Sequence, residues 1–360
     1  MPKHGMIVRT SLVLVAAALV SGLAVNAAGA AGKKHHVRLS GTLNGAGSSL
    51  IAPAIQAMWS PDFKAKGVTV NYASVGSGAG IAQITARTVD FGASDAPMTG
   101  AQAAACKGCV QIPWALTSTS VVVNVPGVHQ GQLHLTGGVV AKIYLGQITK
   151  WNDPAIKALN PGLSLPDLKI TVAHRSDGSG DTYAFTNYLH KVSAPWRHQV
   201  GYATSVNWPV GVGGKGNSGV AAVIGSTPGS IGYVSVAYVL QNHLTLAKMK
   251  NASGKYTLPT IKSIESAAQL VKAHKIPANN AISITDAPKT KNKKYANAYP
   301  LATFTYIIVP KKSPQAALIK AWINFAMSAP EQKRIQKLVF APMPKVVVDA
   351  AKKTLKKIHS

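Results

Sequence analysis

A short polar stretch, residues 173–183 (AHRSDGSGDTY), is the part of this 360-residue chain best suited to binding an oxyanion. Arg175 offers a planar, permanently charged guanidinium that matches a phosphate or carboxylate group. Gly178 and Gly180 let the backbone approach a ligand closely, and Ser179 adds a hydroxyl and an N–H. The apolar pattern that follows predicts a helix with an electropositive N-terminus. The stretch therefore predicts one wall of an anion site.

Two further glycine- and serine-rich loops, residues 47–49 and 77–80, also precede predicted helices. Helix N-termini carry unpaired N–H groups, so three of them can converge on one anion. Any single loop of this kind is an ordinary cap or turn. Together with Arg175, in a chain with only 11 Asp and Glu residues, the three loops predict one shared site.

Asp95 lies at the tip of a turn after a short predicted strand, residues 89–97. A carboxylate beside an anion is repulsive unless it accepts a proton from the ligand, and phosphate carries such protons at ordinary pH whereas sulfate does not. Asp95 is therefore a candidate discriminator between the two anions. The alternative is an Asx-turn residue before Pro97. Asp177, two residues after Arg175, is expected to orient the guanidinium.

The length and composition of the chain predict two globular α/β domains, since 47% of the residues are apolar. Residues 1–30 have a basic start, an apolar run and small residues at the end, which predicts a cleaved secretory signal peptide and an exported protein. An uncleaved membrane anchor is the alternative. No cysteine follows the apolar run, so a lipid-anchored protein is not expected.

The formal net charge of +27 is extreme for an exported protein. It is compatible with nucleic-acid binding, attachment to anionic surfaces or steering of small anions. The basic residues are scattered and Lys-rich, without RNA-binding aromatic motifs, which favours a solvated surface and no nucleic-acid partner. Adaptation to an acidic exterior is a further hypothesis.

The two cysteines, Cys106 and Cys109, form a C-x-x-C pair. In an exported protein a local structural disulfide is the expected state. A thioredoxin-like role requires the pair to open a helix, and a zinc site requires two further ligands, neither of which the sequence offers. No metal or other cofactor is expected.

Periodicity predicts strands, glycine loops and helices in alternation. The glycine run at residues 45–47 is expected in the first loop. The remaining expected elements are a strand over 37–41, a helix over 50–59 with Pro53 in its first turn, a strand over 68–72, a helix after 80, long strands over 112–125 and 301–309, a helix over 314–327 with Ser313 as N-cap, and a helix over 346–358.

The two long strands flank a central region with its own strands and helices, so the chain is expected to leave a first lobe and return to it. We expect lobe I to comprise residues 36–115 and 297–360, and lobe II residues 116–296. In such α/β architectures ligands bind at the carboxyl ends of strands, here between the lobes.

Seven motifs, in order from about residue 43 onward, resemble the periplasmic phosphate-binding proteins of bacterial phosphate ABC transporters. They are residues 45–49 (GAGSS), 89–97 (VDFGASDAP), 143–148 (IYLGQI), 150–153 (KWND), 175–180 (RSDGSG), 213–217 (GGKGN) and 229–234 (GSIGYV). The resemblance implies a type II periplasmic-binding fold, two lobes joined by crossover strands that close on dehydrated inorganic phosphate. It also implies a periplasmic monomer that delivers phosphate to the permease subunits of an ABC transporter.

By motif position the resemblance implies roles for individual residues. Asp95 would accept the ligand proton, Arg175 would clamp the anion and Asp177 would support Arg175. The remaining implied phosphate-binding residues are Ser48, Ser49, Leu50, Ser77, Ser179, Gly180 and Asp181.

The chain departs from the enterobacterial pattern at two positions. Ser49 replaces a threonine, which is conservative, but Asp181 puts an acceptor where the pattern has a threonine hydroxyl. Asp181 is proposed to accept a second phosphate proton and so to favour the more protonated ligand. The alternative is that it turns outward as a first-turn helix residue.

A secreted phosphatase is the less favoured alternative function. A secreted phosphatase lacks support because the sequence has no H-E-x-x-H or G-x-S-x-G motif, and Gly216 after Lys215 excludes a Walker A loop. A basic, secreted oxyanion-binding protein with a surface or adhesive role is the alternative function, and sulfate is a lesser alternative ligand. The expected protein is not an enzyme.

Overall fold

The computed structural model describes residues 39–270 and 276–360, and the chain from Arg38 to Ser360 forms one compact unit. The predicted signal peptide, residues 1–30, lies outside the described residues, as do residues 37 and 38 of the first predicted strand. No helix in the described ranges is long and apolar enough to cross a membrane.

A nine-stranded mixed sheet is the backbone of the described unit, in the order β2-β1-β3-β12-β4-β8-β6-β7, with β9 paired to β4. β1 is parallel to β2 and β3, and β6 is parallel to β7 and β8, whereas β12 and β4 are antiparallel to their neighbours. The strands are β1 (Gly41–Gly47), β2 (Val68–Ser74), β3 (Phe91–Ser94), β4 (Cys109–Asn124), β6 (Thr171–Arg175), β7 (Val212–Gly214), β8 (Ser230–Ser235), β9 (Thr245–Leu246) and β12 (Ala302–Pro310).

The long strand β4 belongs to both halves of this sheet. Its residues Cys109 to Ser118 pair with β12, and Thr119 to Asn124 pair with β8. Nearly every residue of β4 is buried. The crossover expected over residues 112–125 is therefore one continuous strand, and the second expected long strand is β12.

Two large hydrophobic clusters define what we call lobe I and lobe II. The lobe I cluster centres on Trp59, Trp114 and Trp322, whose rings lie 5.3 to 6.3 Å apart. The lobe II cluster includes Trp151 and Trp196. A third cluster joins α11 (Ile261–Gln269) to β12 and so spans the predicted boundary at residue 296. The predicted lobe boundaries stay a prediction.

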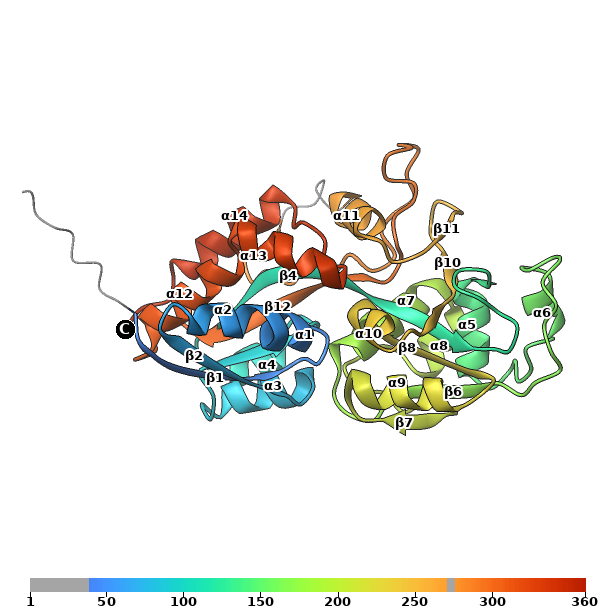
Figure 1. The fold of residues 1–360 in the computed structure, drawn as a ribbon, viewed down its shortest axis with the longest axis horizontal. Helices are drawn as coiled ribbons and strands as arrows, with labels where there is room; N and C mark the ends of the chain where they lie inside the picture. Colours follow the sequence, from blue (N-terminus) through green and yellow to red (C-terminus); the bar gives the residue numbers. More distant parts are fainter. Residues whose placement is uncertain (1–38, 271–275) are drawn as a thin grey trace, which may run out of the picture. The chain divides into compact units, whose positions relative to one another are not determined.

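Helices cover the strands of each lobe (Figure 1). In lobe I these are α1 (Ala52–Ala54), which continues through the π-helix η1 (Ile55–Trp59) into α2 (Ser60–Lys64), then α3 (Ser77–Thr85), α4 (Gly100–Ala105), α12 (Ala316–Ala326), α13 (Ala329–Arg334), the 3-10 turn η3 (Ile335–Leu338) and α14 (Lys345–Leu355). In lobe II they are α5 (Gly137–Tyr144), α6 (Pro154–Lys157), α7 (Gly180–Val192), α8 (Ala194–Gln199), α9 (Gly216–Ser226) and α10 (Val236–Gln241), beside a small sheet of β5 (His134–Leu135), β10 (Lys248–Lys250) and β11 (Tyr256–Thr257).

Most predicted elements are present, including the helix with Pro53 in its first turn. Several predictions about the ends of elements were wrong. The strand expected over residues 37–41 overlaps β1 only at Gly41, and the helix expected over residues 346–358 ends at Leu355. Residues Gly45 to Gly47 lie in β1 rather than in a loop, because they pair with β2 on one side and with β3 on the other. A Cβ at Gly45 would come within 2.1 Å of the Phe91 ring. The helix expected from residue 314 begins at Ala316, with Gln315 rather than Ser313 as N-cap, because the Ser313 hydroxyl instead accepts the Gln315 N–H in the preceding turn.

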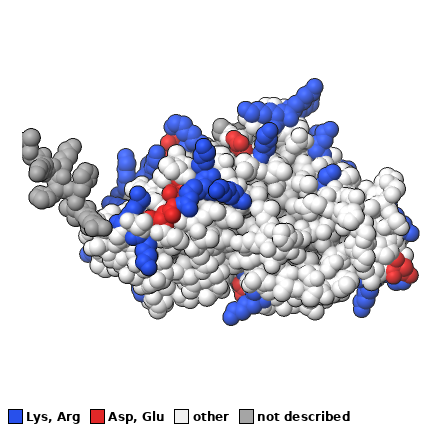
Figure 2. Space-filling view, viewed as in Figure 1, with Lys and Arg blue, Asp and Glu red and all other residues white. Residues whose placement is uncertain are grey.

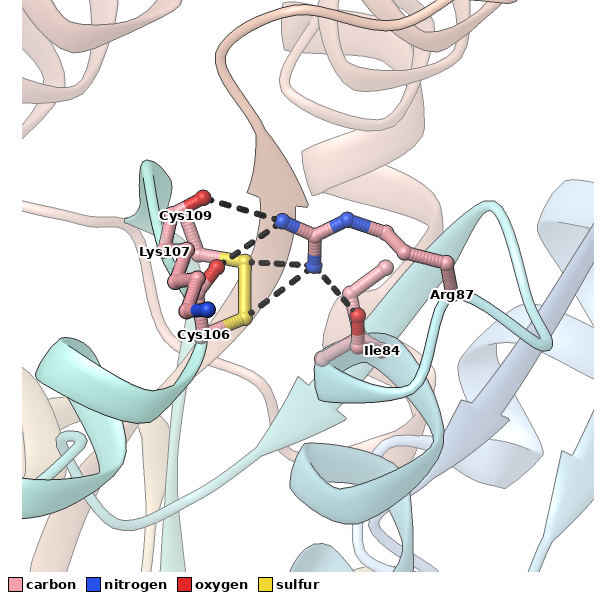
Figure 3. The surroundings of a disulfide bond; sticks show 5 residues. All are labelled: Ile84, Arg87, Cys106, Lys107 and Cys109. Atoms are coloured by element: carbon pink, nitrogen blue, oxygen red, sulfur yellow. Dashed lines mark hydrogen bonds between the residues drawn. A yellow bond between two sulfur atoms is a disulfide. The ribbon is translucent and has the colours of Figure 1, made fainter.

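The predicted disulfide joins Cys106 to Cys109 between α4 and β4 (Figure 3). Arg87, just after α3, donates to the Cys106 and Lys107 carbonyl oxygens at 2.8 and 3.1 Å. One terminal nitrogen of Arg87 also lies 3.4 and 3.2 Å from the two sulfur atoms. The C-x-x-C loop is thus fastened to α3, as expected of a structural crosslink.

The positive charge lies on the surface. On the face in Figure 2, Lys and Arg side chains gather over the C-terminal helices, while most of the remaining face is uncharged. Among the described residues, the buried charged side chains are Asp95, Arg175, Asp181 and Glu331. Arg175 is thus the one buried basic side chain in the ranges that the structure covers.

Candidate functional site

Three of the four buried charged residues come together in one place. Asp95 is 1% exposed, Arg175 3% and Asp181 0%. Burying a charge is costly unless it is paired and hydrogen-bonded, so such a cluster needs a structural or functional reason. All three were selected from the sequence as candidates for an anion site.

The elements place these residues at the carboxyl ends of strands from both lobes. Asp95 directly follows β3, Arg175 is the last residue of β6, and Ser48 follows β1. The helices α3 and α7 begin at Ser77 and Gly180. In parallel α/β sheets this edge is where ligands bind.

Arg175 is held by two carboxylates. Its Nε and Nη2 atoms donate to Asp177 at 2.8 and 2.5 Å, and Nη1 donates to Asp181 at 3.3 Å. Burial alone lowers the pKa of Arg175, but Asp177 and Asp181 outweigh it and raise the pKa above its usual value. A guanidinium has five N–H groups, so these bonds leave one on each terminal nitrogen for another acceptor.

Asp177 is the bidentate partner that the sequence predicted. It also accepts the Gly216 N–H at 3.0 Å, which anchors it to the start of α9. Burial raises the pKa of Asp177, but the hydrogen bond and charge of Arg175 dominate and lower it. Asp177 therefore stays ionised and fixes the plane of the guanidinium.

Asp95 has one oxygen without a hydrogen bond in the described ranges, although the Thr305 hydroxyl lies close enough to lower the pKa of the carboxyl. Its Oδ2 atom accepts the Ser48 hydroxyl at 2.5 Å, whereas Oδ1 is buried without a hydrogen-bond partner within the described ranges. The following turn is closed by Ser94, whose hydroxyl accepts the Ala96 N–H at 3.1 Å, so the Asx-turn alternative is wrong. Burial first, and then the charge of Asp181, raise the pKa of Asp95 to about 7.

Asp181 points inward rather than to solvent, so the alternative of an outward helix residue is wrong. Its Oδ1 atom accepts the Thr119 hydroxyl at 2.7 Å. Its Oδ2 atom accepts the Asn217 side-chain amide at 2.7 Å, in addition to Arg175. Burial raises the pKa of Asp181, although Arg175, Thr119 and Asn217 oppose this shift.

Serine hydroxyls link the helix N-termini to the cluster. The Ser77 hydroxyl accepts the N–H groups of Gly180 and Asp95 at 3.1 and 3.3 Å, and so connects the two lobes. The Ser48 hydroxyl accepts the Leu50 N–H at 3.0 Å. The backbone donors predicted at Leu50 and Gly180 are thus present, with serine oxygens as their acceptors in this structure.

Ser179 is the N-cap of α7. Its hydroxyl accepts the Thr182 N–H at 3.3 Å, and its own N–H donates to the Thr204 carbonyl at 2.8 Å. Its predicted role as a hydroxyl donor is compatible with the cap, because a capping oxygen keeps its proton. Its N–H, in contrast, is already engaged.

Two members of the site, Thr119 and Asn217, were not predicted from the sequence. Thr119 lies in a run of four hydroxyl residues, 117–120, inside the otherwise apolar strand β4, and such a run is a readable signal. Asn217 lies in the quoted motif of residues 213–217 but was given no role. No group of His, Cys, Asp and Glu in the described residues could hold a metal ion.

A family model, described as PBP superfamily domain, matches residues 32–330 of the chain. A phosphate-binding protein PstS of Xylella fastidiosa (strain Temecula1) is 44% identical over 305 residues, which cover 84% of this chain and 81% of that protein. A protein of the same name from Pasteurella multocida is 42% identical and covers 85% of this chain and 88% of its own length.

Solved structures show the same fold at low sequence identity. A phosphate-binding protein from Stenotrophomonas maltophilia has a TM-score of 0.66 and 19% identity, covering 87% of this chain and 93% of its own. A putative phosphate ABC transporter substrate-binding protein from Clostridium perfringens, with bound phosphate, has a TM-score of 0.59 and 18% identity, covering 84% and 100%.

The raised pKa of Asp95 makes the stability of the protein depend on pH. The folded state keeps the Asp95 proton up to about pH 7, whereas the unfolded state releases it near about pH 4. The unfolded state therefore binds fewer protons in this window, and stability falls as the pH rises. We expect the free energy of unfolding of wild type to decrease as the pH rises from about 4 to about 7, and that of Asp95→Asn to decrease less.

Urea titrations of both proteins at several pH values measure this difference. The control is Asp349→Asn, which removes an exposed carboxylate paired with Lys345 and should leave the pH dependence of wild type intact. Parallel stability curves for wild type and Asp95→Asn would contradict the raised pKa.

Proposed function

The chain belongs to the PBP superfamily and, within it, to the PstS phosphate-binding proteins, and on this premise we propose that it captures inorganic phosphate outside the cytoplasm for import by an ABC-type permease. The predicted α/β fold of type II periplasmic-binding proteins is that of the family. The chain is a solute-binding protein and not an enzyme.

One observation carries the choice of phosphate. The Oδ1 atom of Asp95 is buried without a hydrogen-bond partner in the described ranges, and the charge of Arg175 acts on this carboxyl. The cluster offers both strong donors for an oxyanion and one acceptor that requires a proton from the ligand. Phosphate and arsenate carry such a proton near neutral pH, whereas sulfate would face the Asp95 oxygen with a lone pair.

The other site residues supply the donors. Arg175 contributes its two remaining N–H groups, held in place by Asp177. Ser77 would donate its hydroxyl proton, whereas the proton of Ser48 is already donated to Asp95. The N–H groups of Leu50 and Gly180 would pass from serine oxygens to the ligand. The complete proposed set is Ser48, Ser49, Leu50, Ser77, Asp95, Arg175, Ser179, Gly180 and Asp181.

Contacts between the lobes support closure as a hinge around the strands β4 and β12. The Gly78 N–H donates to the Gly178 carbonyl at 2.9 Å, beside the bond from Gly180 to Ser77. These bonds join the starts of α3 and α7, which flank the anion cluster. A ligand held there would be enclosed by both lobes.

Export follows from the signal pattern of residues 1–30, which is typical of a cleaved peptide without a lipid-anchoring cysteine. The expected location of the mature protein is the periplasm, and its expected partners are the membrane permease subunits of the transporter.

Calorimetry with phosphate, arsenate and sulfate tests the proposed ligand. Wild type should bind phosphate and arsenate and reject sulfate. Asp95→Asn should narrow the preference for phosphate over sulfate by roughly 5- to 150-fold, the equivalent of about 1 to 3 kcal/mol for one unsatisfied buried acceptor. Unchanged sulfate rejection would count against the role of Asp95, and absence of phosphate binding in wild type would overturn the function.

Asp181 is a second carboxylate paired with Arg175, in addition to Asp177. Because both Asp95 and Asp181 are buried and their charges repel, we propose that the site favours the more protonated form of phosphate. Oδ1 of Asp181 keeps one lone pair beyond the Thr119 bond, so it can accept a ligand proton directly.

Replacement of Asp181 tests this preference. The phosphate affinity of wild type should fall more steeply between about pH 5 and about pH 8 than that of Asp181→Thr, because the variant lacks one buried negative charge. Asp181→Asn keeps the shape of the side chain and should resemble Asp181→Thr if charge is the cause. Identical pH dependence in all three proteins would refute the proposal.

A further inference from the structure

Asn217, at the start of α9, connects the two lobes through one fully buried side chain. Its Nδ2 atom donates to the Ser49 hydroxyl of lobe I at 2.9 Å and to Asp181 of lobe II at 2.7 Å. Its Oδ1 atom accepts the Ser235 N–H at 2.7 Å. Because that backbone N–H can only donate, the orientation of the amide is determined.

Asn217 also determines what the Ser49 hydroxyl can do. Besides the bond from Nδ2, the backbone N–H of Asn217 donates to the same oxygen at 3.2 Å. A hydroxyl has two acceptor lone pairs and one proton, so two incoming bonds leave it only as a donor. Ser49 is thus prepared for an oxygen atom without a proton, in contrast to Asp95.

The amide of Asn217 further holds Asp181 in place. The amide of Asn217 and the guanidinium of Arg175 both donate to the Oδ2 atom of Asp181, and the Thr119 hydroxyl donates to Oδ1. Thr119 and Ser235 are paired residues of β4 and β8, so Asn217 and Asp181 are both tied to the crossover strand. One side chain therefore contacts the lobe I helix start, the Arg175 counterion and the end of β8.

We propose, on the basis of the proposed function, that Asn217 is a positioning residue that acts as a latch. Its side chain stabilises the closed arrangement of the lobes over phosphate and leaves the Ser49 hydroxyl able only to donate its proton. The other contacts described between the lobes lie at the starts of α3 and α7. Asn217 instead contacts Ser49, in the turn just before the helical segment 52–64. Loss of the Asn217 side chain should ease opening and shorten the residence of the ligand, without slowing its entry.

Rapid-mixing measurements of inorganic phosphate binding and release test the latch. Asn217→Ala should raise koff by about 10- to 100-fold and leave kon within about 3-fold, since the contacts are made only after closure. In a Ser49→Ala background the same substitution should raise koff much less, because part of its effect acts through Ser49. Asn217→Asp keeps the size of the side chain, and it should also accelerate release because it removes the donor.

The matched control is Asn160→Ala, which removes another buried amide of lobe II that donates to the carbonyl oxygens of His134 and Ile156 at 2.9 Å each. It should lower the thermal midpoint and leave koff unchanged. The latch would be contradicted if Asn217→Ala and Asn217→Asp release phosphate at the wild-type rate, or if the effects of Asn217→Ala and Ser49→Ala on koff are fully additive. Neither outcome would contradict phosphate binding itself. If wild type does not bind phosphate at all, the proposed function fails and the latch fails with it.

Discussion

The burial of Arg175 is the constraint on which the rest of the site depends. A guanidinium that is 3% exposed needs counterions and acceptors within hydrogen-bonding distance, because an unpaired buried charge is strongly destabilising. Asp177 and Asp181 meet this need from the loop and helix that directly follow β6. With two carboxylates paired to one arginine, we propose that an entering anion is repelled unless it brings protons.

The two lobes approach each other closely because glycines lie at the starts of the helices α3 and α7. A Cβ at Gly180 would come within 2.5 Å of the Asp95 Cβ, and one at Gly78 within 3.1 Å of the Gly178 Cα. Glycine at position 180 is required for this approach, whereas a side chain at position 78 would need Gly178 to move by a few tenths of an ångström. The electropositive helix ends and the buried carboxylates therefore lie in one place because side chains are absent there.

Much of the site could be predicted because its residues lie in local sequence motifs. Arg175, Asp177 and Asp181 fall within seven residues of one another, and Asp95 ends a recognisable strand and turn. The run of hydroxyl residues 117–120 marks β4 as unusual, but which member faces the site depends on the register of β4 against β8. The role of Asn217 depends on which lobe faces the start of α9. The fold was predicted at the level of lobes and crossover strands, whereas Gly45 was misread because the Phe91 ring that excludes a side chain there is distant in sequence.

The central claim is that buried carboxylates select phosphate by its protons. Calorimetry of phosphate binding to wild type at about pH 8, repeated in buffers with different ionisation enthalpies, measures the protons exchanged on binding. At this pH phosphate in solution is mainly the dianion, and Asp95, with a pKa of about 7, is mainly ionised in the free protein. The account predicts net uptake of about one proton per phosphate, because the single proton of the dianion serves Asp95 and the proposed preference of Asp181 for the more protonated ligand requires a second one. Binding without proton uptake would contradict it.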